Sequence, residues 1–138
     1  MDKLRILVVD DNQAHAVGLV ELLAIQGFPS FHVSSGGEAL QIAANQTLDA
    51  VLLDVQLPDM SGYEVCRRLR RNERTANLAI VFHSGSELPY KHGHQGDAFL
   101  TYPVELAHLF GVIRGCVARR RASMSLVPVV QPAWPLAQ

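Results

Sequence analysis

Acidic residues follow two short apolar runs of the chain. Asp10 and Asp11 come directly after the run Leu4 to Val9, Asp54 closes a later run, and the hydroxyl residue Ser84 closes another. A single acid at such a position is commonly a helix cap or a turn residue. If the runs are parallel strands, however, their carboxyl ends meet at one edge, where three like charges repel and need a cation. An oxygen-rich site of this kind suits Mg²⁺, and we therefore predict a magnesium site.

The chemistry open to such a site is phosphoryl transfer. A carboxylate beside Mg²⁺ can attack phosphorus and form an acyl phosphate, whose charge the metal neutralises. A site for a free nucleotide or flavin phosphate would need a glycine-rich or hydroxyl-rich first turn. Here that turn consists of Asp10, Asp11 and Asn12, whose charge repels a free phosphate.

The elements that must position these residues follow an alternating pattern. Short apolar runs alternate with helical patterns up to about residue 121, which predicts an α/β fold with parallel strands. The expected strands are Leu4–Val9, Phe31–Ser34, Ala50–Leu53, Leu78–Phe82 and Ala98–Thr101. The expected helices are one between Asn12 and Gly27, Glu38–Ala44, one that opens with a Ser61/Glu64 capping box and ends at Arg71, and Val104 to about Arg121.

Length and composition indicate a single domain. The chain has 138 residues, of which 49% are hydrophobic, enough for one core. We expect a domain over residues 1–121 and a proline-containing tail or linker over residues 122–138 that is disordered. The net charge of -1 provides no field toward nucleic acid or a membrane, and no apolar run reaches membrane-spanning length. We expect a cytoplasmic protein with Cys66 and Cys116 as buried, reduced thiols.

Four motifs in order carry a resemblance to a known family. VVDD, LLDVQLPDMSG, FHSG and FLTYP together resemble the receiver domain of two-component response regulators. The resemblance covers residues 3 to about 121 and implies a doubly wound, five-stranded parallel sheet, the flavodoxin-like (βα)₅ fold. It implies these roles: Asp54 as phosphoacceptor, Asp11 and more indirectly Asp10 as Mg²⁺ ligands with the backbone carbonyl of Gln56, Ser84 as a hydrogen-bond partner of the phosphoryl group, and Phe99 as a reorienting aromatic. From the residues alone, the preferred interpretation is that Ser84 is an ordinary strand-end hydroxyl and Phe99 an ordinary core aromatic.

The sequence departs from the family at Tyr102. The family almost always has a lysine before this proline, and the lysine acts as a counter-ion for the phosphoryl group. A tyrosine supplies one neutral hydroxyl and cannot balance a dianion. We expect Asp54 chemistry to persist and the coupling of phosphate to the active state to weaken by about tenfold, since neutral hydrogen bonds contribute less than charge-assisted ones.

A second departure lies between Ser84 and Tyr102. This segment is about one helical turn shorter than in the family, and Pro89, Gly93 and Gly96 interrupt it, so we expect a short or irregular fourth helix. In the family the corresponding face commonly carries dimerisation and output, which leaves a homodimer possible. Three residues of this segment, Lys91, His92 and His94, are expected to be exposed; the histidines are interpreted as solvated rather than as a metal site.

The resemblance implies a histidine kinase or phosphotransfer protein as phosphodonor, and output through an unidentified partner protein or a domain outside the chain. The arginines are interpreted as solvated helix faces, without direct nucleic-acid contact. Two alternatives remain open. One is a pseudo-receiver, an interaction module that phosphorylation does not control. The other is a phosphatase, which is disfavoured because Gln56 stands where a second general acid would be. We expect no enzymatic activity beyond self-phosphorylation and dephosphorylation.

Overall fold

The computed structural model describes residues 3–85 and 95–130. Five parallel strands form one sheet in the order β2-β1-β3-β4-β5. The strands are β1 (Ile6–Val9), β2 (Ser30–Val33), β3 (Ala50–Asp54), β4 (Ala79–Ser84) and β5 (Ala98–Thr101). The predicted strands therefore all exist, with boundaries shifted by no more than two residues.

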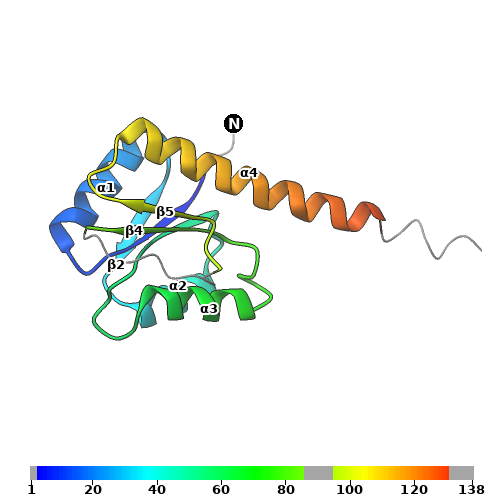
Figure 1. Cartoon of the computed structure of the whole chain (residues 1–138), viewed down its shortest axis with the longest axis horizontal. Helices are drawn as coiled ribbons and strands as arrows, with labels where there is room; N and C mark the ends of the chain where they lie inside the picture. Colours follow the sequence, from blue (N-terminus) through cyan, green and yellow to red (C-terminus); the bar gives the residue numbers. More distant parts are fainter. Residues whose placement is uncertain (1–2, 86–94, 131–138) are drawn as a thin grey trace, which may run out of the picture.

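Helices cover both faces of the sheet. They are α1 (Gln13–Ile25), α2 (Gly36–Asn45), α3 (Gly62–Arg71) and α4 (Leu106–Val130). Figure 1 shows α1 and α4 on one side of the sheet and α2 and α3 on the other, which matches the two buried clusters of the core. The predicted doubly wound α/β fold is confirmed.

The central strands are apolar along their whole length because both of their faces are covered. In β1, Ile6 and Val8 belong to the cluster under α1 and α4, whereas Leu7 and Val9 belong to the cluster under α2 and α3. Successive side chains of a strand point to opposite faces, so a strand between two helical layers needs apolar residues at every position.

The helix caps place the loops that follow β1 and β3. Asn12 caps α1 as expected, and its side chain accepts a hydrogen bond from the backbone N–H of His15. Ser61 caps α3, but the expected capping box does not form. The Glu64 carboxylate instead accepts hydrogen bonds from Arg67 and Arg68, because these guanidinium groups lie within one turn of it and charge-assisted hydrogen bonds are stronger.

The last helix is longer than predicted. It was expected to end near Arg121, but α4 continues to Val130, so the expected disordered tail is wrong for residues 122–130. Residues 122–127 contain neither glycine nor proline, so no helix breaker stops α4 at the end of its apolar pattern. Residues 131–138 lie outside the described part of the chain, and the domain boundary at residue 121 stays a prediction.

The predicted irregular fourth helix, with Lys91, His92 and His94, falls on residues 86–94, also outside the described part. Cys66 and Cys116 are buried and free, as expected, and burial raises the pKa of both thiols. Among the described residues, no helix is both long and apolar enough to span a bilayer.

Candidate functional site

A cavity of about 440 Å³ lies at the carboxyl edge of the sheet, where β1, β3 and β4 end. Its lining residues are Asp10, Asp11, Asn12, His15, Asp54, Gln56, His83, Ser84, Gly85 and Tyr102. The structure thus brings to one cavity all of the residues singled out from the sequence except Phe99.

Three carboxylates meet in this cavity. One oxygen each from Asp10, Asp11 and Asp54 lies within 4.8 Å of the others. The register of the sheet explains the meeting, because Val9 pairs with Leu53 and the residues that follow them are Asp10 and Asp54. Asp10 is buried, with 2% of its surface exposed, whereas Asp11 is exposed and Asp54 is intermediate.

The electrostatics of Asp54 reflect this crowding. Burial, and then the negative charges of Asp10 and Asp11, raise its pKa to about 6, although a hydrogen bond from the backbone N–H of Gln56 at 3.2 Å opposes the shift. A divalent cation among these oxygens would relieve the repulsion. An all-oxygen donor set is also the one that Mg²⁺ prefers, so the residues present fit this ion.

The loop after β3 is held close to Asp54 by Gly62. A Cβ atom at this glycine would lie 2.1 Å from the carbonyl oxygen of Asp54, so no side chain fits there without a shift of the backbone. The Gly62 N–H donates to the carbonyl of Val55 at 2.7 Å. Farther along the loop, the Asp59 carboxylate accepts from the backbone N–H groups of Gly36 and Gly37, both at 2.8 Å, which ties the loop to the start of α2.

His15 contacts the buried acid, and the sequence analysis did not single it out. Asp10 accepts from the Asn12 N–H at 2.9 Å with one oxygen and lies 2.5 Å from Nδ1 of His15 with the other. An ionised carboxylate only accepts hydrogen bonds, so Nδ1 carries the proton. The available sequence signal was the Asn12 cap, since the third helical residue after a cap lies beside the end of the preceding strand.

Tyr102 packs against two histidine rings. Its ring centroid lies 4.6 Å from that of His15 and 5.2 Å from that of His83, both edge-on. Its backbone N–H donates to the Ser84 carbonyl at 2.9 Å, and the peptide bond before Pro103 is cis. The Tyr102 hydroxyl is buried without a hydrogen-bond partner among the described residues, and burial raises its pKa, so it stays neutral.

His83 is the second residue that the sequence analysis missed. Only 1% of its surface is exposed, although it ends a strand beside a charged cavity. Burial lowers the pKa of its imidazole well below the usual range, against the opposing effect of the nearby Asp10 charge, and the ring is therefore neutral at pH 7. The sequence signal was weak, because a lone histidine at a strand end is commonly a core residue.

Ser84 and Phe99 are placed differently. Ser84 is buried at the carboxyl end of β4 and lines the cavity. Phe99 packs with the core cluster under α2 and α3, with its ring 6.1 Å from that of Phe82. The structure therefore places Phe99 in the packing of the sheet rather than in the wall of the cavity, and its reorientation stays a prediction.

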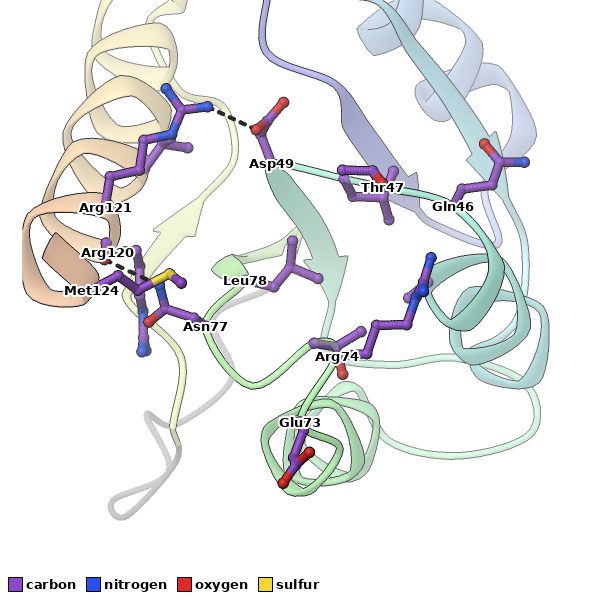
Figure 2. Close-up of a pocket in the computed structure, with 14 residues that line it drawn as sticks. Gln46, Thr47, Asp49, Glu73, Arg74, Asn77, Leu78, Arg120, Arg121 and Met124 are labelled. Atoms are coloured by element: carbon purple, nitrogen blue, oxygen red, sulfur yellow. Dashed lines mark hydrogen bonds and ion pairs between the residues drawn. The ribbon is translucent and has the colours of Figure 1, made fainter. Parts of the chain in front are cut away.

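A second cavity, of about 390 Å³, lies at the opposite edge of the sheet, between the ends of α2 and α3 and the middle of α4 (Figure 2). Polar contacts cross it: Arg121 donates to the Asp49 carboxylate at 2.9 Å, and the Asn77 amide donates to the carbonyl of Arg120 at 3.1 Å. The Asp49 carboxylate is paired with Arg121, whereas three carboxylates meet at the carboxyl edge, so we place the candidate active site there.

Comparisons with known proteins identify the family of the chain. The family model of the response regulator receiver domain matches residues 6–109. The response regulator MprA of Mycobacterium sp. (strain KMS) is 35% identical over 117 residues, which cover 83% of this chain and 51% of that protein. The chain therefore spans about half the length of this curated relative.

Solved structures show the same fold. A sensor protein from Polaromonas sp. JS666 is 30% identical with a TM-score of 0.80, covering 86% of this chain and 99% of that one. The response regulator TrrA from Thermotoga maritima, solved in complex with Mg(2+)-BeF, is 25% identical with a TM-score of 0.76, covering 83% of this chain and 99% of that one. By family match, sequence identity and fold, the chain belongs to the receiver domains of two-component response regulators.

Proposed function

We propose that this receiver domain accepts a phosphoryl group on Asp54 with the help of Mg²⁺. The observation that carries the proposal is the meeting of three carboxylates within 4.8 Å at the carboxyl edge of the sheet. Asp11, Asp54 and the backbone carbonyl of Gln56 would hold the ion, with Asp10 acting more indirectly. The Mg(2+)-BeF complex of TrrA, a protein of the same fold, supports this assignment.

The transfer itself would be a displacement at phosphorus. A carboxylate oxygen of Asp54 attacks the phosphorus of a phosphohistidine, a P–O bond forms, and the P–N bond to the donor imidazole breaks. When bound, Mg²⁺ neutralises charge on the transferring phosphoryl oxygens. Because the pKa of Asp54 is about 6, the carboxylate is mostly ionised, and therefore nucleophilic, at pH 7.5.

The readout of phosphorylation would be weak or rerouted. The Ser84 hydroxyl lines the cavity and would hydrogen-bond the phosphoryl group, and Phe99 would reorient with it. Tyr102 occupies the position of the usual cation, but its hydroxyl is neutral and its ring packs on His15 and His83. It therefore cannot balance the new charge, and we expect about tenfold weaker coupling than a lysine would provide.

The partners follow from this chemistry. A histidine kinase or a phosphotransfer protein in the cytoplasm would supply the phosphoryl group, and a downstream protein or a further domain would receive the signal. We propose neither nucleic acid nor a membrane as a direct partner of the domain. Because the chain matches only about half of MprA, the output of any longer protein is part of this proposal.

Intact-mass measurement after incubation with a small-molecule phosphodonor tests the proposal. The wild-type chain should gain one phosphoryl adduct with Mg²⁺ and none with EDTA, and Asp54→Asn should gain none. Asp49→Asn is the matched control, because this carboxylate lies at the opposite edge of the sheet and its loss should leave labelling unchanged. An adduct that persists in Asp54→Asn would refute the site, whereas no adduct on the folded wild type would favour the pseudo-receiver alternative.

A further inference from the structure

Two histidines at the carboxyl edge play no part in the phosphoryl chemistry proposed above. One ligand atom each from Asp10, His15 and His83 lies within 4.8 Å of the others. The three residues come from the end of β1, the first turn of α1 and β4. His83 is far from the other two residues in sequence, so only the fold brings it to them.

The unpaired nitrogen of His83 points to a ligand. Its Nε2 is buried and has no hydrogen-bond partner among the described residues, on a side chain that is 1% exposed. A neutral imidazole has one ring nitrogen with a free lone pair, which can bind a metal.

We propose that Asp10, His15 and His83 form a binding site for a divalent transition metal, with Zn²⁺ as the probe. Two imidazoles and one carboxylate are a set that Zn²⁺ takes in proteins, with its remaining position open to water. The open position would face the cavity, which all three residues line. Imidazole nitrogens suit Zn²⁺ and disfavour Mg²⁺, so this site differs in selectivity from the three carboxylates.

The site needs only a small rearrangement to close on a metal. Tetrahedral ligands at about 2.0 Å from Zn²⁺ lie about 3.3 Å from one another. Nδ1 of His15 and the Asp10 oxygen are 2.5 Å apart and would separate slightly, and the metal would replace the proton on Nδ1, which is released to solvent. The side chain of His15 is 35% exposed on α1 and can move, whereas Asp10 and His83 are fixed in the core. The edge-on ring of Tyr102 covers both imidazoles.

Calorimetric titration of the full chain with ZnCl₂ in a buffer without chelators tests the proposal. The wild type should bind one equivalent, and His15→Gln should bind at least tenfold more weakly. His108→Gln is the matched control, since it removes an exposed histidine of α4 away from the cavity. Asp54→Asn should weaken binding much less than His15→Gln does, because it removes a neighbouring charge and not a ligand of the zinc.

A second measurement separates this site from other histidines and from an unfolded variant. In the wild type, Zn²⁺ should shift the NMR resonance of His83 Nε2, and His15→Gln should lose that shift at the same zinc concentration. No binding by the wild type, unchanged binding by His15→Gln, or loss of binding in a His92→Gln/His94→Gln double variant would each overturn the proposal. Weaker binding in Asp54→Asn than in His15→Gln would also overturn it, because the zinc would then lie among the three carboxylates.

Discussion

Acidic side chains have opposite electrostatic surroundings at the two edges of the sheet. At the amino edge, Asp97 accepts from Arg70 at 3.1 Å, from Arg120 at 2.9 Å and from the backbone N–H of Ile80 at 2.8 Å. At the carboxyl edge, Asp54 faces two other acids, and burial and repulsion raise its pKa to about 6. At the amino edge, two arginines compensate the charge of Asp97. At the carboxyl edge, the carboxylates of Asp10 and Asp11 add to the negative charge around Asp54.

This difference indicates a structural role for the amino edge and a functional role for the carboxyl edge. The network around Asp97 joins α3, β4 and α4 just before β5, and the pairs in the nearby cavity tie α4 to the start of β3 (Figure 2). Such compensated groups hold elements together. Uncompensated acids and buried polar atoms without partners cost stability, and proteins retain them where a ligand or a reaction uses them.

The largest effect on stability should come from removing the charge of Asp97 at the amino edge. Asp97→Asn keeps the shape of the side chain but leaves Arg70 and Arg120 without a counter-charge, and Arg70 is largely buried. We expect the free energy of unfolding to fall by about 3 kcal/mol in urea titrations, because removing one member of a buried ion pair leaves an uncompensated charge. Glu64→Gln, at an exposed pair on α3, should have no measurable effect. If Asp97→Asn and Glu64→Gln had the same free energy of unfolding, the ion pairs of Asp97 would not stabilise the amino edge as described.

Removing the charge of Asp54 at the carboxyl edge should stabilise the fold. Well below the unfolded pKa of 3.8, Asp54 is protonated in both the folded and the unfolded chain and contributes nothing. As the pH rises from there to the folded pKa of about 6 the cost of ionising Asp54 grows, and above that pKa it reaches its full value. Asp54→Asn should therefore raise the free energy of unfolding by about 1 to 2 kcal/mol at pH 7.5, a range discounted for partial exposure, and by almost nothing at about pH 3. The same gain at both pH values would show that charge is not its source.

A lysine in place of Tyr102 should strengthen the binding of a phosphoryl-like group at the carboxyl edge and the conformational change that follows it. Tyr102→Lys places an ammonium group near Asp10 and Asp54, whose charges already act on Tyr102. We expect about tenfold tighter binding of beryllofluoride with Mg²⁺, followed by NMR shifts of β4 and β5, since a charge-assisted hydrogen bond replaces a neutral one. Tyr102→Met, which has no charge, should show no gain. If both variants bind equally, the ring of Tyr102 rather than its lack of charge limits the switch.

The smallest effect should come from removing a hydroxyl without a partner. Tyr102→Phe deletes a buried hydroxyl that has no hydrogen-bond partner among the described residues, so stability should stay unchanged or rise by up to about 1 kcal/mol. Thr75→Val is the contrast, because the Thr75 hydroxyl donates to the Leu69 carbonyl at 2.7 Å in the core. Its removal should lower the free energy of unfolding by about 1 to 2 kcal/mol. Thermal unfolding of both variants checks the difference.

Local patterns predicted the elements well because strands and helices have fixed periods. The five strands appear where apolar runs are bounded by turn residues, and Asn12 caps the first helix as expected. One prediction failed because local partners competed: Glu64 was expected in a capping box but binds two arginines. Another failed because the apolar pattern ends before the helix does: the end of α4 was placed at Arg121, although the helix continues to Val130.

The sequence by itself determined the fold and the meeting of Asp10, Asp11 and Asp54, because parallel strands bring their carboxyl ends to one edge. It also marked Tyr102 as a departure from the family. Only the tertiary structure decided what surrounds that tyrosine. His15 reaches Asp10 from the first turn of α1, whereas His83 reaches it from β4, and no sequence period links His83 to positions so far from it. Burial and the loss of a hydrogen-bond partner are properties of the packed chain, so the zinc site could be inferred only from the folded protein.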